Sequence, residues 1–204
     1  MKYVYSVFFL IIIFLGKAQT TYTFDYKFLI RINNDFANKS QYLINSENSN
    51  YCMYEYNNEG KLFNYGSDEV TKFNHKIESG KSAYTFISSQ KLTPNNELDI
   101  DHTIVEKIGE NKYSIKCFSK LDNKKASLEI TAKLKSQDKD LIRFYFSDLS
   151  ESVHKKLIAS LKEKLNGNYN FMIESYKIDY KNGFKISNSI KNVEKINLKM
   201  TFQN

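Results

Sequence analysis

Apolar and polar residues alternate with a period of two along most of the chain. The run from Tyr22 to Ile32 carries an aromatic or aliphatic side chain at every second residue, and so does the run from Ala126 to Leu134. This alternation is typical of a strand with one buried face and one wet face. Apolar-rich or alternating runs predict further strands at 41–45, 50–56, 61–65, 70–77, 83–87, 103–108, 112–118, 141–146, 169–180 and 196–202.

Short polar connections separate many of these runs. Asn57-Asn58-Glu59-Gly60 and Lys181-Asn182-Gly183-Phe184 are hairpin signals, which predict an antiparallel meander. The phase of the alternation shifts between Ile173 and Tyr176, which predicts a bulge. The stretch Ser88–Asp101 holds Pro94 and few apolar residues, so we expect a surface loop there.

One segment follows a helical period instead. Asp148 and Glu151 fit the N-cap and N3 positions, and Asn166-Gly167 supplies a stop signal, so a helix is predicted from about Leu149 to Leu165. We expect its apolar stripe to pack on the concave face of the sheet, because no other apolar surface is large enough. The stripe consists of Val153, Leu157, Ile158, Leu161 and Leu165.

These elements predict a mainly β fold, a β-rich α+β arrangement. About ten strands cannot remain flat, so we expect a single curved antiparallel sheet or half-barrel with one late amphipathic helix. No repeat or linker divides residues 19–204, which are predicted to form a single domain.

Residues 1–18 read as a secretory signal peptide. Met1-Lys2 is basic, the run Val4–Leu15 is mostly apolar, and Gly16 and Ala18 supply small residues before a cut after Ala18. The run is short for a spanning helix, although an uncleaved anchor stays open as the alternative. We therefore expect an exported protein, periplasmic or extracellular, with no transmembrane segment in the mature chain.

The amino-acid composition and charge indicate which classes of binding partner to expect. Phe and Tyr number 15 each and hydrophobic residues make up 41%, enough for a substantial core. The net charge is +7, but Arg31 and Arg143 are the only arginines and the lysines are scattered. Phosphate binding by nucleic-acid-binding proteins needs a concentrated basic stripe, so we expect no nucleic-acid partner.

Two cysteines are present, Cys52 and Cys117. An oxidising destination would permit a disulfide between them, and the alternative is a pair of buried thiols that never meet. Cys117 shares the inward phase of Tyr113 and Ile115, whereas the phase of Cys52 is ambiguous.

Chemical motifs are scarce. Asp99, Asp101 and His102 form the only local cluster that could bind a metal ion, and its spacing matches no closed zinc site. His75 could face the core and His154 is expected at the wet edge of the helix. No Gly-x-Ser-x-Gly elbow or phosphate loop occurs, so we expect no catalytic activity, no cofactor and no metal.

Aromatic residues are dense on the short strands between Tyr51 and Phe86. Bulky groups occupy both faces of Tyr51-Cys52-Met53-Tyr54, which indicates a strand covered twice or a strand that lines a ligand cavity. Core packing is the plainer interpretation. As candidate ligand-binding residues we take Tyr51, Tyr54, Tyr56, Phe63, Phe73, Tyr84 and Phe86.

The order of elements resembles that of small secreted envelope proteins of the Bacteroidetes type. These elements are a leader that ends in Lys17-Ala18-Gln19, a long first strand, a meander, a late helix and a returning hairpin. The order of elements is also similar to the half-barrel of LolA-like lipoprotein carriers, although those place helices early. The resemblance implies a carrier of acyl chains and transfers no site residues. Our leading hypothesis is a non-enzymatic protein that binds an apolar or amphipathic ligand, or an envelope partner. A structural or interaction protein with a filled core is the alternative, and a secreted hydrolase the third.

Overall fold

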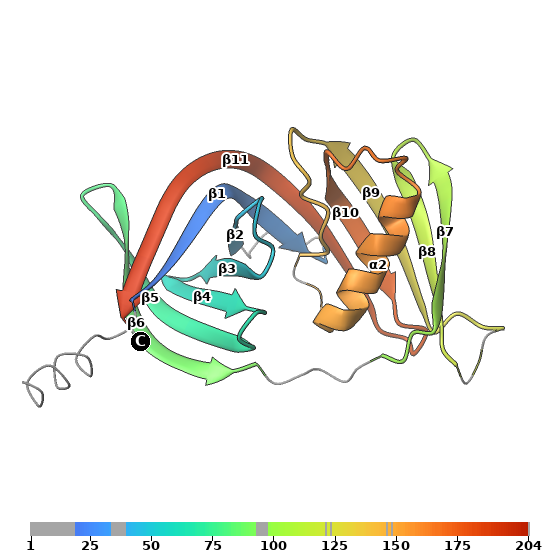
Figure 1. Ribbon diagram of the computed structural model, residues 1–204, viewed down its shortest axis with the longest axis horizontal. Helices are drawn as coiled ribbons and strands as arrows, with labels where there is room; N and C mark the ends of the chain where they lie inside the picture. Colours follow the sequence, from blue (N-terminus) through green and yellow to red (C-terminus); the bar gives the residue numbers. More distant parts are fainter. Residues whose placement is uncertain are drawn as a thin grey trace, which may run out of the picture.

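Eleven antiparallel strands form one open sheet in the computed structural model of the protein (Figure 1). The structure describes residues 19–33, 40–92, 98–120, 122, 124–145, 147 and 149–203. The strands are β1 (Gln19–Ile32), β2 (Ser40–Ile44), β3 (Tyr51–Tyr56), β4 (Glu59–Asn64), β5 (Glu69–Glu78), β6 (Lys81–Lys91), β7 (His102–Gly109), β8 (Lys112–Phe118), β9 (Leu128–Ser136), β10 (Phe171–Asp179) and β11 (Lys185–Gln203). The mainly β fold with a curved, open sheet is therefore confirmed.

The order of the strands is β6-β5-β4-β3-β2-β1-β11-β10-β9-β8-β7. The chain starts in the middle with β1, runs outward to the edge at β6, crosses to the opposite edge at β7, and returns inward to β11. Strands β1 and β11 pair from Gln19↔Gln203 to Ile32↔Asn188 and arch over the molecule (Figure 1). Register shifts between Phe24 and Tyr26 and between Lys27 and Leu29 interrupt this ladder, and such irregularities bend strands.

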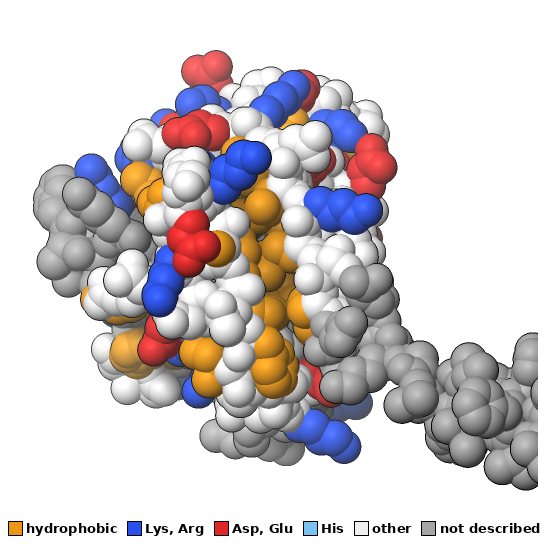
Figure 2. All heavy atoms as spheres, turned by 90° about the vertical axis from the view of Figure 1, so that its left-hand side faces the viewer, with side chains coloured by type: hydrophobic (Ala, Val, Ile, Leu, Met, Phe, Trp, Pro, Cys, Tyr) orange, Lys and Arg blue, Asp and Glu red, His pale blue; other side chains and the backbone are white. Residues whose placement is uncertain are grey.

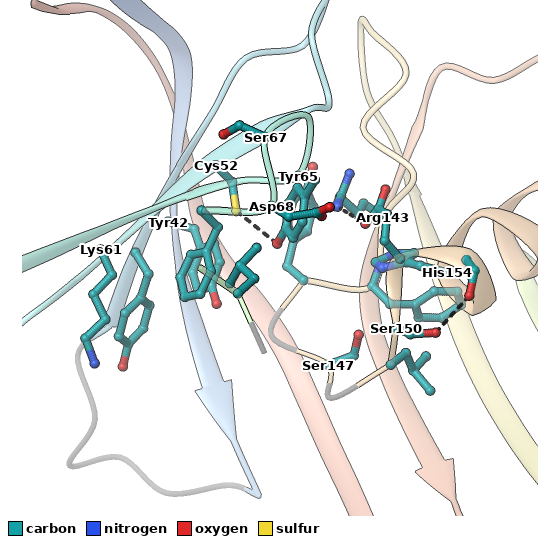
Figure 3. Close-up of a pocket in the computed structure, with 18 of the residues that line it drawn as sticks. Tyr42, Cys52, Lys61, Tyr65, Ser67, Asp68, Arg143, Ser147, Ser150 and His154 are labelled. Carbon is teal, nitrogen blue, oxygen red and sulfur yellow. Dashed lines mark hydrogen bonds and ion pairs between the residues drawn. The ribbon is translucent and has the colours of Figure 1, made fainter. Parts of the chain in front are cut away.

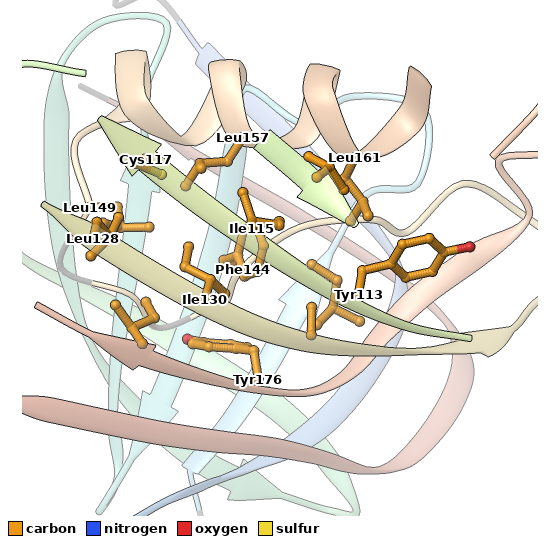
Figure 4. Close-up of a cluster of buried hydrophobic side chains, with 14 of the residues drawn as sticks. Tyr113, Ile115, Cys117, Leu128, Ile130, Phe144, Leu149, Leu157, Leu161 and Tyr176 are labelled. Carbon is orange, nitrogen blue, oxygen red and sulfur yellow. The ribbon is translucent and has the colours of Figure 1, made fainter. Parts of the chain in front are cut away.

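The single helix in the described residues, α2 (Glu151–Glu163), covers the half of the sheet formed by β7 to β10 (Figure 1). Leu157 and Leu161 are fully buried against this half, as predicted (Figure 4). The N-cap is Ser150, two residues later than expected, and its side chain accepts a hydrogen bond from the Val153 N–H. Together with neighbouring strands, α2 builds the helical cluster, which also includes Ile115, Ile130, Phe144 and Tyr176.

The other half of the sheet, β2 to β6, curls beneath the β1–β11 arch (Figure 1), and its strands β2 and β3 have buried hydrophobic side chains on both faces. One face joins the central cluster, composed of Tyr26, Phe28, Ile30, Tyr42, Ile44, Cys52, Leu141, Tyr145, Met172 and Ile190. The other joins the arch cluster, composed of Tyr22, Phe24, Leu43, Met53, Leu62, Phe73 and Met200. Strand β3 is thus covered twice, with Cys52 in one cluster and Met53 in the other, because the arch bends over its second face.

The curled half does not close into a barrel. Figure 2 shows hydrophobic side chains along a furrow on the face that lies at the left of Figure 1. Partly buried residues that pack against the arch cluster are Tyr51, Tyr84, Ile196, Leu198 and Phe202.

Two predicted boundaries are wrong. Strand β6 extends to Lys91, so Ser88–Lys91 is strand and not loop. Residues 141–146 were predicted as a strand, but of the described residues 141–145 only Leu141 forms a bridge, with Met172. Residues 141–145 are all buried, and they cross between the two halves instead of pairing. Ile142 and Phe144 enter the helical cluster, while Leu141 and Tyr145 enter the central cluster.

Other sequence predictions are confirmed. The ladder between β9 and β10 shifts register between Ile173 and Ser175, where the bulge was expected. The hairpin at 181–184 joins β10 to β11. The predicted signal peptide, residues 1–18, lies outside the described residues. Within the described part of the chain, no helix combines the length and apolar character that crossing a bilayer requires.

Candidate ligand cavity

A cavity of about 770 Å³ lies between the curled half of the sheet and the segment that leads into α2. Its walls come from β2, β3 and β4, from residues 65–68, from the end of β6, and from residues 143–154 (Figure 3). A smaller cavity of about 400 Å³ adjoins it. Five residues line both cavities and therefore separate them: Cys52, Arg143, Tyr145, Glu151 and His154.

One wall of the larger cavity is aromatic. Tyr42, Tyr54, Phe63 and Tyr65 line it from neighbouring strands and the turn after β4. The rings of Tyr42 and Tyr54 are 5.3 Å apart, and a 2.8 Å hydrogen bond joins the Tyr54 hydroxyl to the Ser40 hydroxyl. The tyrosines thus present ring faces and edges while their hydroxyls find partners, which suits an amphipathic ligand.

Arg143 lies at the junction of the two cavities. Its Nη2 donates to Glu151 Oε2 at 2.8 Å, and its Nη1 donates to the backbone carbonyl of Ser49 at 2.9 Å. The guanidinium also lies 4.7 Å from the centre of the Tyr65 ring, within the range of a cation–π interaction. Arg143 is therefore held on one side by residues of the turns after β2 and β4, and on the other by the first residue of α2.

His154 forms part of the same junction, and the expectation that it lies at a wet edge is wrong. The side chain is buried, and its Nε2 accepts a 2.9 Å hydrogen bond from the Phe144 N–H. Burial and the nearby Arg143 charge lower the pKa of His154 to about 3. The ring is therefore neutral near pH 7, with its proton on Nδ1.

The cysteines are free thiols, so the disulfide that the sequence permitted is absent from the structure. Cys52 belongs to the central cluster, with its Sγ 3.6 Å from the Tyr65 hydroxyl, and Cys117 belongs to the helical cluster. Burial raises the pKa of both thiols, that of Cys117 to about 12. A nucleophilic cysteine needs a lowered pKa, so both thiols have the character of core residues.

Histidine and acidic residues elsewhere give no metal centre. Among the described residues, no group of three or more His, Cys, Asp or Glu side chains could hold a metal ion. Nδ1 of His102 lies 3.4 Å from Oδ2 of Asp101, and both side chains are exposed. His75 stacks on Tyr84 with ring centres 4.8 Å apart, and its Nε2 lies 3.1 Å from the Ser82 hydroxyl.

The aromatic residues that were predicted from the sequence to contact a ligand do not lie together in the structure. Tyr54 and Phe63 line the larger cavity, and Tyr51 lines the smaller one. Phe73 is buried in the arch cluster, and Tyr84 packs on it and donates a hydrogen bond to Glu55. Tyr56 and Phe86 are exposed and line neither cavity. Three of the seven predicted residues therefore line a cavity, while two lie in or against the arch cluster and two are exposed.

The polar residues at the junction were missed. Arg143 is a lone charge within the apolar run Leu141–Phe146, and a charge in such a run needs a buried partner. That signal pointed to Arg143 but not to Glu151, because their contact depends on how the segment turns into α2.

Comparison with known proteins adds no relative: neither the models of known protein families nor the curated proteins contain a match to this chain.

Proposed function

We propose that the protein is an exported, non-enzymatic binding protein that holds an apolar or amphipathic ligand in the larger cavity. The observation that carries this proposal is the cavity itself, about 770 Å³ with an aromatic wall and a few convergent polar groups. Ligand sites in proteins typically measure about 300–1,000 Å³ and have this kind of lining. The resemblance to acyl-chain carriers agrees with the same class of ligand.

The chemistry of the junction favours binding over hydrolysis. Nε2 of His154 is occupied by the Phe144 N–H, and burial raises the pKa of the Cys52 thiol. Neither group is poised as a general base or a nucleophile. A purely structural role remains the second candidate, and the filled arch cluster, which takes up Phe73, favours it.

Extraction of the purified protein with organic solvent, followed by mass spectrometry, would identify a bound lipid. Titration with an apolar fluorescent probe such as N-phenyl-1-naphthylamine then measures the affinity. Phe63→Ala should weaken probe binding by about tenfold, because it removes an aromatic contact in the wall. Phe86→Ala is the matched control, since Phe86 is an exposed aromatic of the same sheet that lines neither cavity.

Circular dichroism of both variants would verify that they fold. Saturable probe binding that Phe63→Ala weakens and Phe86→Ala leaves unchanged supports the cavity. If no lipid is extracted and no probe binds saturably, the structural role is favoured. If Phe86→Ala alone weakens binding, the site lies on the exposed face of β6 and the proposal is wrong.

A further inference from the structure

Arg143 is a largely buried charged group of the proposed site. Its side chain is 10% exposed, and it borders both cavities. A buried arginine is costly unless its donors are satisfied, and arginine remains protonated at every physiological pH.

The guanidinium has more donors than the protein uses. It carries five N–H groups, of which two are hydrogen-bonded, to Glu151 and to the Ser49 carbonyl, in the part of the chain that the structure describes. The cation–π contact with Tyr65 and the two hydrogen bonds together restrain the guanidinium. A planar, fixed fork with spare donors is suited to bind a carboxylate through two parallel hydrogen bonds.

Among the described residues that line the larger cavity, the positive and negative charges do not balance. Lysine and arginine side chains contribute three positive charges, and aspartate and glutamate contribute two negative charges, while His154 is neutral. The positive residues are Lys61, Lys91 and Arg143, and the negative residues are Asp68 and Glu151. A ligand with a single negative charge would neutralise this lining, whereas a phosphate monoester, with nearly two negative charges near pH 7, would exceed it.

The start of α2 adds to the same wall. Residues 149–152 line the larger cavity, so the positive end of the helix dipole lies beside Arg143. Glu151 lies in the same field and accepts a hydrogen bond from Arg143. A ligand carboxylate would therefore bind beside Glu151, at the remaining donors of the guanidinium.

From this geometry we infer that the ligand is a long-chain monocarboxylate, a fatty-acid-like amphiphile, whose carboxylate binds Arg143 while its chain lies along Tyr42, Tyr54 and Phe63. The inference rests on the proposed function, because it names the ligand class of the same cavity. It makes Arg143 a specificity-determining residue, since the aromatic wall accepts any apolar chain, whereas the buried guanidinium binds the carboxylate of an acid and not the uncharged head of its ester.

The test compares palmitic acid, methyl palmitate and cetyl phosphate as competitors of the fluorescent probe on the wild-type protein near neutral pH. The three share chain length and differ in head-group charge. The acid should bind at least about tenfold more tightly than the ester, in keeping with a hydrogen bond to a charged group. It should also bind more tightly than the phosphate.

The paired variant Arg143→Met/Glu151→Gln removes both charges without leaving one of them buried alone. In it, the preference for acid over ester should fall below about twofold, while ester binding persists. The matched control is Lys133→Met/Glu174→Gln, which removes an ion pair of the same 2.8 Å length that lines neither cavity. This control should keep the full preference.

The outcomes separate the inference from the function on which it rests. Three results would contradict a carboxylate ligand but not the ligand cavity. They are equal binding of acid and ester by the wild type, tighter binding of the phosphate, and a preference for the acid that persists in the Arg143→Met/Glu151→Gln variant. Absence of binding by all three ligands and the probe would overturn the function itself. If the paired variant does not fold, Arg143→Lys decides, because a lysine keeps the charge but loses the two parallel bonds; an undiminished preference would contradict the inference.

Discussion

The backbone N–H of Phe144 donates a hydrogen bond to Nε2 of His154 across 2.9 Å, in the interior of the protein. The acceptor must be an unprotonated ring nitrogen, so the folded state holds His154 in its neutral form. This single contact joins the start of α2 to the segment that crosses between the two halves of the sheet.

The first prediction concerns pH. The pKa of His154 is about 3 in the folded state and about 6.5 in an unfolded chain, so the unfolded state binds the proton more readily. Stability is therefore unaffected by this group above about pH 6.5 and falls as the pH decreases toward 3, by up to about 1.4 kcal/mol per pH unit. Urea unfolding at about pH 6.5 and pH 5 should show a loss of about 1–2 kcal/mol.

The control is His154→Gln, whose side-chain carbonyl can still accept the Phe144 N–H but does not titrate. It should lose much less stability over the same interval. The carboxylates with lowered pKa, Asp138, Asp179 and Glu174, lose their contribution mainly as the pH falls below their unfolded pKa values, about 3.9 for Asp and about 4.3 for Glu, which lie below this window. An equal pH dependence in the wild type and the variant would contradict the prediction.

The second prediction concerns the helix. Leu161→Ala should lower the free energy of unfolding by about 2–5 kcal/mol, because Leu161 is fully buried in the helical cluster and its loss leaves a cavity. Ile77→Ala, at a residue 74% exposed, should change it by less than about 0.5 kcal/mol. Denaturant unfolding measures both, and a Leu161→Ala protein as stable as the wild type would mean that α2 does not cover the sheet.

The third prediction concerns the thiols. Cys52 and Cys117 are buried in different clusters, so neither should react with a thiol reagent in the native state, and both should react after denaturation. Reductant should leave the unfolding curve unchanged. Two thiols that stay unreactive in denaturant without reductant would reveal a disulfide and show the free-thiol arrangement to be wrong.

The fourth prediction compares two acidic residues at the smaller cavity. Glu151→Ala deprives the buried Arg143 of a charged partner and should cost about 1–3 kcal/mol. Glu47 pairs with Lys139 at a similar distance, 2.7 Å, but both side chains are exposed, so Glu47→Ala should cost less than about 1 kcal/mol. Thermal and urea unfolding measure the difference, and equal costs would mean that burial does not strengthen the Arg143 pair.

Sequence periodicity was sufficient for the local elements. The stripe on α2 and the phase shift after Ile173 are features of neighbouring residues, and the structure has both where they were predicted. The segment Leu141–Phe146 shows the limit of this reasoning. An apolar run is compatible with a doubly covered strand and with a buried crossing segment, and periodicity does not distinguish them.

The residues of the candidate site could not all be predicted from the local sequence pattern, because they are brought together by long-range geometry. Phe63 on β4 lines the cavity, whereas Phe73 on β5 lies in the arch cluster, because the sheet curls and its two faces meet different partners. Nothing in the local pattern tells the two residues apart. Arg143 and Glu151 are only eight residues apart, but their contact depends on the cap at Ser150 and on the direction of the preceding segment.

The pairing of β1 with β11 also has a consequence for how the protein folds. Gln19 lies opposite Gln203, so the two strands at the centre of the sheet come from opposite ends of the described chain. During synthesis, β1 lacks its central neighbour until the last strand has emerged from the ribosome. Contacts between residues so distant in sequence slow folding, because a long loop must close before any of them forms. We therefore expect the two halves of the sheet to join only after β11 has left the ribosome, and removal of β11 to leave them as separate, marginally stable fragments.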